Sequence, residues 1–323
     1  MSNPPIIKNI SVGWDGSPEG LDVFLTWKER ISDVYFAAPG APTGRNSRFE
    51  RSPCHATKTE GFVKELTRHG LRSNLLLNGM CQGELTGTSR WTKFVRDTLE
   101  HFAKLGLTDV TCSSVEDMAT IKRHFPELTV HSSVNMFVDS VAKCAQVMDF
   151  ADVINLDRSI NYDFERICEI RDFARHKTLK ILVNEGCLYQ CIHRIHHFNA
   201  LSHNTNLPRP YCERYFISKP QTVLYTPIIR PEDLFHYFGI INVYKLATRH
   251  VASVEHLQLI LKAYIEEDYN GNLFDLISSD GLAAAQENVG KFYIDNKSIP
   301  FDYFVHRAET KGQWIPETSK KDA

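Results

Sequence analysis

Short apolar stretches alternate with longer amphipathic stretches along most of this chain. The apolar stretches are rich in β-branched and aromatic residues, and between them apolar positions recur every three or four residues. This pattern predicts strands at 6–14, 33–40, 72–80, 107–114, 128–135, 151–157, 180–187, 222–229 and 241–247. It predicts helices at 21–30, 59–70, 91–106, 115–126, 137–150, 164–176 and 231–239.

Strands that are separated by single helices indicate parallel βαβ units. The eight or nine strand candidates fit a closed (β/α)8 TIM-like barrel better than an open sheet. A doubly wound open sheet is the alternative, but "GWDGSPEG" after the first strand lacks the spacing of a dinucleotide-binding motif. We therefore expect a barrel at 1–265 and, where the alternation stops, a small helical and hairpin C-terminal extension at 266–323.

Composition and charge narrow the possible partners. Among the 323 residues 42% are hydrophobic and 24% are charged, and the net charge of −2 does not favour duplex nucleic acid or a membrane surface as the main partner. The chain has no apolar run long enough to span a bilayer, and "MSNPPIIKNISVGWDG" does not resemble a secretory leader. We expect a cytoplasmic protein whose eight cysteines are free or metal-bound thiols.

Polar side chains follow several of the predicted strands. In a (β/α)8 barrel the active site lies where strands end and βα loops begin. Glu185 and Arg158 are the catalytic candidates, because a buried carboxylic acid can act as an acid or base and a guanidinium can hold an anion. The alternative for Glu185 is a salt bridge with Lys245 or Arg249. The candidates for substrate binding are Asn135, Lys245, Arg249, Arg194 and His197.

Cysteines cluster in and after "VNEGCLYQC", which closes the strand predicted at 180–187. Cys187 and Cys191 are separated by three residues, and Cys212 follows a polar loop. This spacing allows two thiolates to share one metal or cluster, although unligated thiols and a zinc site remain alternatives. A site with four cysteine ligands needs one more thiolate, and Cys54, in a polar loop after the second strand, is our candidate; its alternative is an exposed thiol.

The loop around these cysteines is rich in histidine and arginine. Arg194 and His197 belong to it, together with His193, His196, His203, Arg209 and Arg214. A cationic lining suits a substrate that carries a carboxylate or phosphate, because guanidinium pairs bidentately with such groups. The alternative is a solvated loop whose charges have no ligand.

Three segments carry a resemblance to a known family. The segments "LKILVNEGCLYQCIHRIHHF", "INLDRSINYDFERICEI" and "IIRPEDLFHYFGIINVYKLATR" resemble the collagenase-like peptidase family (peptidase U-32), and the resemblance extends over roughly residues 6–265. It implies a (β/α)8-like barrel. Some members are the paired proteins of ubiquinone biosynthesis that hydroxylate without oxygen, and others hydroxylate RNA bases. They hold a [4Fe-4S] cluster on four cysteines and use prephenate as the oxygen donor.

The resemblance implies a ligand set for this chain. "SPCHATKTE" around Cys54 resembles a cysteine-bearing loop of one ubiquinone-pathway member, and the other ligands would be Cys187, Cys191 and Cys212. Here a close pair precedes the single cysteine, whereas that family has the reverse order. We expect an iron–sulfur enzyme that modifies a small metabolite or peptide by oxygen-independent hydroxylation or a related redox step. The alternatives are a non-catalytic barrel that partners a homologous protein, and a hydrolase or peptidase.

Overall fold

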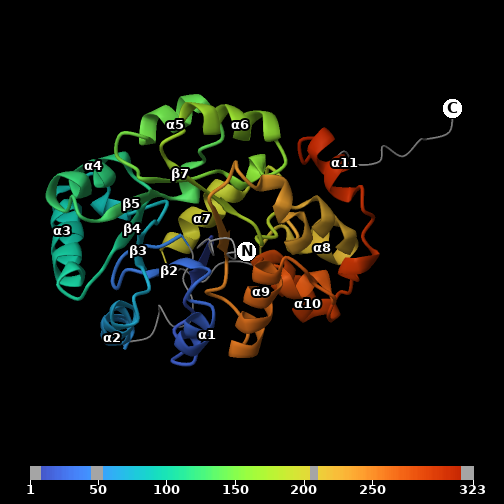
Figure 1. Ribbon diagram of the computed structural model, residues 1–323, viewed down its shortest axis with the longest axis horizontal. Helices are drawn as coiled ribbons and strands as arrows, with labels where there is room; N and C mark the ends of the chain where they lie inside the picture. Colours follow the sequence, from blue (N-terminus) through green and yellow to red (C-terminus); the bar gives the residue numbers. More distant parts are fainter. Residues whose placement is uncertain (1–8, 45–53, 204–209, 314–323) are drawn as a thin grey trace, which may run out of the picture.

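The chain folds around a closed barrel of parallel strands (Figure 1). This computed structural model describes residues 9–44, 54–203 and 210–313. The strands are β1 (Ile10–Gly13), β2 (Ile31–Ala37), β3 (Ser73–Leu77), β4 (Asp109–Cys112), β5 (Thr129–Ser132), β6 (Val153–Asn155), β7 (Thr178–Leu182) and β8 (Val243–Leu246). Each strand pairs with the next in sequence, and β8 closes the barrel against β1 with Lys245 opposite Ser11. The expected (β/α)8 TIM-like barrel is confirmed.

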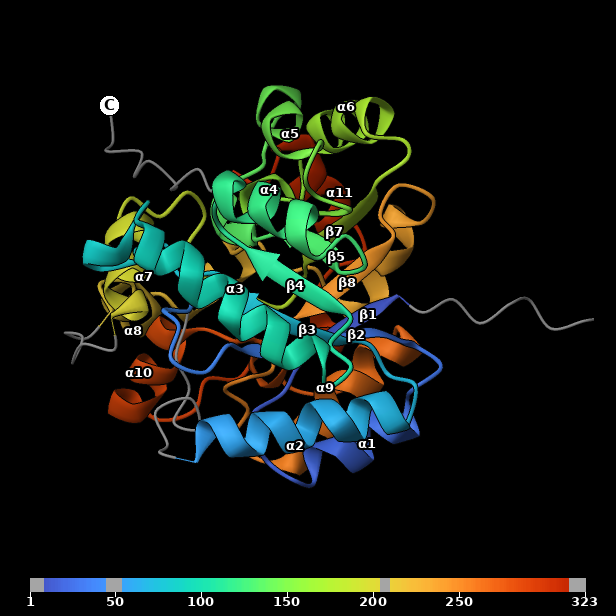
Figure 2. The same cartoon turned by 90° about the vertical axis from the view of Figure 1, so that its left-hand side faces the viewer.

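Helices surround this barrel (Figures 1 and 2). They are α1 (Gly20–Thr26), α2 (His55–Arg68), α3 (Ser89–Ala103), α4 (Val115–His124), α5 (Val141–Val147), α6 (Phe164–Phe173), α7 (Arg194–Ser202), α8 (Glu213–Ser218), α9 (Val254–Glu266), α10 (Asp280–Val289) and α11 (Tyr303–Glu309). Within the described ranges, no helix combines the length and the apolar character that crossing a membrane requires.

Helix α3 illustrates how the amphipathic pattern builds the outer layer. Its buried side chains Trp91, Val95, Leu99 and Phe102 recur every three or four residues and face the strands. Thr88 caps the first turn, because its side chain accepts a hydrogen bond from the backbone N–H of Trp91 at 3.3 Å. Each large apolar side chain buried in this way contributes roughly 1.5–3 kcal/mol to stability.

The barrel interior contains a buried polar network. Lys180 Nζ on β7 lies 2.7 Å from Asp33 Oδ1 on β2 and 3.1 Å from Ser11 Oγ on β1. His131 Nε2 on β5 lies 2.9 Å from Asp109 Oδ1 on β4. Burial by itself raises the pKa of Asp33, but the charges of Lys180 and His131, together with hydrogen bonds from Lys180 and Asn74, outweigh it and hold that pKa below its usual range. The Lys180–Asp33 pair therefore joins two strands that are not neighbours in the barrel.

The strand expected at 222–229 is wrong. Pro220 begins a 3₁₀ helix that ends at Tyr225, and no strand follows it before β8 in the described chain. The apolar side chains Val223 and Ile228 that suggested a strand are buried in a second core. Proline provides no N–H for a sheet, and both Pro220 and Pro227 occur here. The helix expected at 231–239 is also a 3₁₀ helix, Pro231–Tyr237.

The second core joins the C-terminal extension to the long insertion between β7 and β8. Its buried members are Phe216, Val223, Ile228, Leu273, Phe274, Ile277, Leu282, Ala285 and Ile299. A hairpin was expected in the extension, and among its described residues the only antiparallel pairing is one bridge between Asn272 and Asp295. The extension consists mainly of α10, α11 and short 3₁₀ turns, and it packs on the insertion instead of forming an isolated appendage.

The segment "NEG" after β7 connects the barrel to this extension. Gly186 N donates a hydrogen bond to Ser278 O at 2.9 Å, and Ser278 N donates one to Asn184 O at 2.8 Å. A β-carbon at Gly186 would overlap Ile277, so glycine is required for this close approach. The pairing fixes the backbone at Glu185, whose side chain lies at the mouth of the barrel.

Candidate functional site

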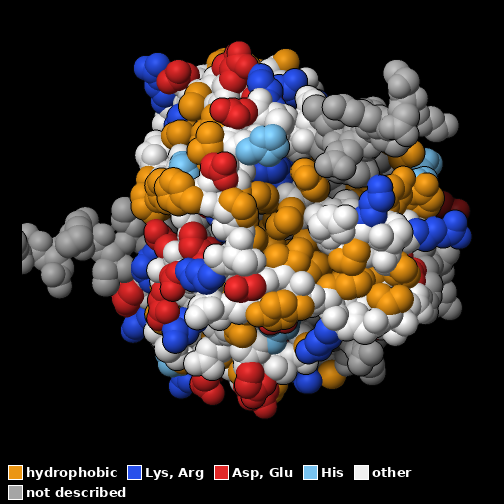
Figure 3. All heavy atoms as spheres, turned by 90° about the vertical axis from the view of Figure 1, so that its right-hand side faces the viewer, with side chains coloured by type: hydrophobic (Ala, Val, Ile, Leu, Met, Phe, Trp, Pro, Cys, Tyr) orange, Lys and Arg blue, Asp and Glu red, His pale blue; other side chains and the backbone are white. Residues whose placement is uncertain are grey.

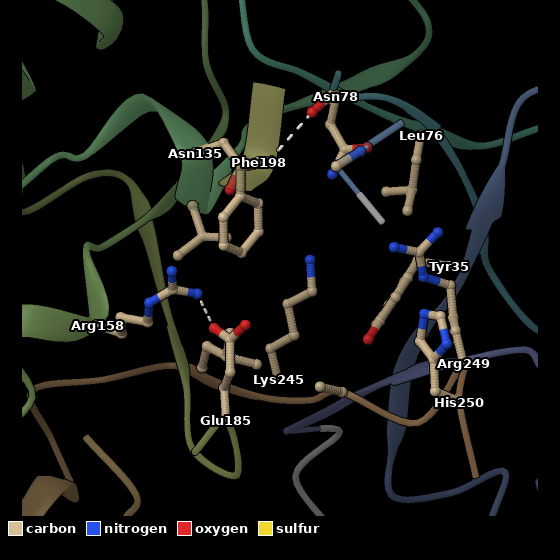
Figure 4. A pocket seen from close by; sticks show the side chains of 14 residues that line it. Tyr35, Leu76, Asn78, Asn135, Arg158, Glu185, Phe198, Lys245, Arg249 and His250 are labelled. Atoms are coloured by element: carbon tan, nitrogen blue, oxygen red, sulfur yellow. Dashed lines mark hydrogen bonds and ion pairs between the residues drawn. The ribbon is translucent and has the colours of Figure 1, made fainter. Parts of the chain in front are cut away.

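A cavity lies at the carboxyl ends of the barrel strands (Figure 4). It is lined by Tyr35, Gly44, Leu76, Asn78, Val134, Asn135, Arg158, Leu182, Glu185, Phe198, Lys245, Ala247, Arg249 and His250. Its volume of about 60 Å³ holds roughly four water molecules or a group such as a carboxylate with the atoms next to it. Active sites of such barrels lie at the carboxyl ends of the strands, and we therefore take this cavity as the candidate site.

Lys245 lies at the centre of the cavity. Its amine comes from β8, points between the Arg158–Glu185 pair and Tyr35, and lies 4.3 Å from the centroid of the Tyr35 ring (Figure 4). The residue is 7% exposed, and among the described residues its amine has no hydrogen-bond acceptor and no counter-ion. Burial, with additional repulsion from Lys180 and Arg249, lowers the pKa of Lys245 to about 7.

Arg158 and Glu185 form a buried ion pair on one wall of the cavity. Each is 4% exposed, and Arg158 Nη1 donates to Glu185 Oε2. The Arg158 guanidinium also lies 4.9 Å from the centroid of the Phe198 ring, which belongs to α7. The sequence suggested Lys245 or Arg249 as a salt-bridge partner of Glu185, and the structure instead pairs it with Arg158.

Arg249 and Tyr35 form the opposite wall. The Arg249 guanidinium lies 5.9 Å from the centroid of the Tyr35 ring, and the Tyr35 hydroxyl donates to Leu246 O at 2.6 Å. A β-carbon at Gly13 would lie 2.7 Å from Arg249 Cγ and 2.8 Å from the Tyr35 ring. Glycine at this position of β1 therefore leaves the space that both side chains occupy.

Two asparagines close the remaining side. Asn135 Nδ2 donates to the backbone carbonyl of Asn78 at 3.2 Å, which is the second dashed contact in Figure 4. Asn78 Oδ1 accepts from Gly44 N at 3.1 Å. Asn135, predicted as a substrate contact, thus lines the cavity and also holds the loop after β3 in place.

Arg194 and His197, the other predicted substrate contacts, lie outside this cavity. Arg194 Nη2 lies 2.6 Å from Asp157 Oδ2, and its guanidinium lies over the Phe137 ring at 4.1 Å. Burial raises the pKa of Asp157, but the hydrogen bond and charge of Arg194 outweigh it and lower that pKa. His197 Nε2 lies 3.7 Å from Asp280 Oδ2 of α10. These contacts hold α7 on the barrel and extension.

Comparison with known proteins places the chain in a family. It is 30% identical to the "Uncharacterized protease MJ1657" of Methanocaldococcus jannaschii over 283 residues, which cover 84% of this chain and 81% of that protein. The chain belongs to the U32 peptidase family. The structure of the U32 peptidase Mk0906 shares the fold, with a TM-score of 0.54 and 18% identity over 76% of this chain and 95% of that one. No family model matches the sequence. The archaeal relative confirms the predicted resemblance to the U32 peptidase family.

The cysteines of this U32 family member lie in different surroundings. Within the described ranges, no three His, Cys, Asp or Glu side chains are grouped so that they could hold a metal ion. Cys212 packs against α10, where a β-carbon at Gly281 would overlap its Sγ, and Cys191 lines a separate pocket beside Tyr215. Cys54 is exposed at the start of α2, and Cys187 is half-buried after β7. The iron–sulfur cluster on these four thiols therefore stays a prediction.

Several cavity residues were missed from the sequence. Tyr35, Asn78, Phe198 and His250 line the site, and the network around Lys180 lies within the same barrel. Tyr35 and Phe198 gave no signal, because aromatic residues in strands and helices are usually core. The charged side chains of Asp33 and Lys180 within apolar strands were a usable signal, since a buried charge needs a partner.

Proposed function

We propose that this U32 family protein is an enzyme that binds the anionic group of a small metabolite or peptide in the barrel cavity. Lys245 and Glu185 would move protons at the atoms next to that group. The observation that carries the proposal is the buried amine of Lys245, which opens on a cavity where Arg249 and the Arg158–Glu185 pair form the walls.

The charges of the cavity favour an anion. Arg158 is paired with Glu185, and Arg249 and the protonated fraction of Lys245 are two further cationic groups among the lining residues. A carboxylate can take up this charge and pair with the guanidinium of Arg249 through two hydrogen bonds. The small volume admits the anionic group with its neighbouring atoms and leaves the rest of a larger substrate outside.

Binding of small carboxylates tests this proposal. We expect succinate or malonate to bind the wild-type protein, and Arg249→Ala to weaken binding by about tenfold, which corresponds to roughly 1.4 kcal/mol. Calorimetric titration measures both affinities. Arg175→Ala is the matched control, because Arg175 is an exposed arginine that pairs with Asp172 on the outer surface of α6. Equal affinities in wild type and Arg249→Ala would contradict the proposal.

Oxygen-independent hydroxylation at an iron–sulfur cluster is a second candidate. The feature that favours it is that Cys187, Cys191 and Cys212 all belong to the insertion that follows β7, next to the cavity end of the barrel. Anaerobic purification with iron and sulfide analysis tests it, and about four of each per chain are expected for a cluster on four cysteines. Cys187→Ala and Cys191→Ala should lose the iron, whereas Cys168→Ala, an exposed thiol on α6, should retain it.

Peptide hydrolysis is the activity in the name of the archaeal relative. The anion-binding cavity is compatible with a peptide carboxyl terminus as the bound group. Incubation with casein and gelatin tests this activity, and Lys245→Met provides the matched inactive variant. Cleavage that persists in Lys245→Met would place the hydrolytic site elsewhere.

Association with a homologous barrel is a further proposal that follows from the family resemblance. Figure 3 shows hydrophobic side chains gathered on the face that carries α8, α10 and α11. Exposed apolar side chains of the insertion and extension are Ile192, Tyr211, Val289, Tyr293, Phe301 and Val305. Such patches frequently mark protein contacts. Co-purification from native cells, followed by mass spectrometry, shows whether a second U32 barrel binds.

A further inference from the structure

Lys245 differs from the other buried cations in what surrounds its nitrogen. Lys180, in the same barrel, contacts Asp33, Ser11 and His131. In the described part of the chain, the Lys245 amine has no hydrogen-bond acceptor; it lies 4.3 Å from the centroid of the Tyr35 ring and points into the cavity (Figure 4). A buried amine without an acceptor is expected to be neutral, or to be charged only when a bound ligand supplies the acceptor.

The surroundings of Lys245 favour the neutral amine. Among the described residues, the charged or titratable groups around it are Asp33 and Tyr35 of β2, Lys180 of β7, and Arg158, Glu185, Arg249 and His250 of the cavity wall. Lys180 already neutralises Asp33 at 2.7 Å, so Lys245 gains little from that carboxylate. Burial and two cationic neighbours bring its pKa to about 7, at which half of the amine carries a free lone pair near neutral pH.

We propose that Lys245 is a nucleophile that forms a reversible imine with the carbonyl carbon of a small oxo acid held in the barrel cavity. This inference rests on the proposed anion binding and adds the substrate class. Arg249 binds the carboxylate of the oxo acid, and the adjacent carbonyl carbon then lies toward Lys245, because both side chains face the same small cavity. A neutral buried lysine beside other cations is the arrangement that activates an amine for this reaction.

The step balances without an oxidant or reductant. The lone pair of Lys245 Nζ attacks the carbonyl carbon, the C–N bond forms, and the π electrons move to the oxygen, which takes a proton while the nitrogen releases one. The C–O bond of this carbinolamine then breaks, the hydroxyl leaves with a proton as water, and the nitrogen lone pair forms the C=N bond. We assign the acceptance and return of these protons to the Glu185 carboxylate, because it lines the same cavity as Lys245.

Borohydride trapping tests the imine directly. We expect pyruvate, glyoxylate or 2-oxoglutarate with sodium borohydride to add one reduced, covalent adduct per chain, which peptide mass spectrometry locates on Lys245. The matched ligands lactate, glycolate and 2-hydroxyglutarate keep the carboxylate but lack the carbonyl, and they should give no adduct. Trapping should accelerate as the pH rises through about 7, because the neutral amine is the nucleophile.

Lys245→Arg and Lys93→Arg are the matched variants. Lys245→Arg keeps the positive charge and should lose the adduct, whereas Lys93→Arg removes an exposed lysine of α3 and should keep it. Thermal unfolding verifies that both variants are folded. An adduct on Lys245 alone supports the inference.

Two results would overturn the inference. If the oxo acids and hydroxy acids bind in an Arg249-dependent manner but no adduct forms, Lys245 is not a nucleophile and the proposed anion-binding function stands. If adducts form equally on surface lysines and persist in Lys245→Arg, the trapping is non-specific and the inference fails. Absence of any carboxylate binding would overturn the proposed function itself, together with the imine.

Discussion

The barrel interior contains two buried lysines with opposite surroundings: Lys180 lies in the half that holds the polar network, and Lys245 lies in the half that holds the cavity. In the network half, Lys180 lies 2.7 Å from Asp33 Oδ1 and contacts two further polar side chains. In the cavity half, Lys245 has no acceptor among the described residues, and its pKa falls to about 7. Both lysines are buried, so burial alone does not distinguish them.

The difference separates a lysine that stabilises the fold from one whose amine is left without an acceptor by the described residues. A buried ammonium that is paired and hydrogen-bonded keeps its proton and joins strands. A buried amine without partners destabilises the fold when it is protonated, and as the neutral form it keeps a reactive lone pair. The polar network therefore belongs to the fold, whereas the cavity belongs to the candidate function.

The largest expected change in the free energy of unfolding is in the polar network around Lys180. Asp33→Leu leaves Lys180 buried without its counter-ion, and we expect the free energy of unfolding to fall by about 3–5 kcal/mol. Urea unfolding monitored by circular dichroism measures the change. The double variant Asp33→Leu/Lys180→Met should recover much of the loss, because it removes the orphaned charge. A loss below about 1 kcal/mol in the single variant would mean that the pair is not structural.

The next effect concerns the cavity half, where Lys245 should make the free energy of unfolding depend on pH. The pKa of Lys245 is about 7 when folded and 10.5 in its ordinary range, so between these values the unfolded chain binds more protons than the folded chain. The free energy of unfolding of wild type, relative to Lys245→Met, should therefore rise with pH by about 1.4 kcal/mol per unit in this window. Urea midpoints from about pH 7 to about pH 10 measure it. If the free energies of unfolding of wild type and Lys245→Met changed with pH in parallel, Lys245 would not be desolvated in the folded protein.

A smaller effect is expected where β1 leaves space for the cavity wall. Gly13→Ala places a β-carbon 2.7 Å from Arg249 Cγ and should displace Arg249 or Tyr35. We expect weaker carboxylate binding and a stability loss of about 1–3 kcal/mol, measured by calorimetric titration and thermal unfolding. Gly61→Ala in α2 is the control: a β-carbon there meets no atom within 4 Å, so it should stabilise by about 0.5–1 kcal/mol.

The smallest effect is expected at His197. This residue was predicted to bind substrate, but it contacts Asp280 of α10 and lies outside the cavity. His197→Ala should leave carboxylate affinity within about twofold of wild type, a change below about 0.5 kcal/mol. A loss as large as that of Arg249→Ala, measured by the same titration, would extend the site to α7 and α10.

Much of the site was predictable because of one rule of the fold. Asn135, Arg158, Glu185 and Arg249 follow strands and Lys245 lies near the end of β8. They line one cavity because all parallel strands end at the same side of a barrel. This reasoning needs only strand positions. It did not reach Tyr35 or Phe198, whose sequence neighbourhoods do not differ from those of core residues.

Residues on the insertion were harder to place. Arg194 and His197 lie between β7 and β8, where the alternating pattern is lost, and their partners Asp157 and Asp280 are distant in sequence. The expected strand at 222–229 failed for the same reason: its apolar side chains are buried by the extension, and burial in a second core requires no strand. The arrangement of Cys187 and Cys191 likewise depends on how this insertion packs.

The sequence by itself predicted a barrel of parallel strands and the end at which the candidate site lies, because hydrophobic periodicity and chain connectivity are local properties. Only the tertiary structure decided which charges are paired. Lys180 and Lys245 look alike in sequence, since each lies in an apolar strand. What separates them is that Asp33 lies close enough to pair with Lys180 across the barrel, whereas the amine of Lys245 opens on the cavity. Electrostatic energy depends on distance and burial, and both are set only when the chain has folded.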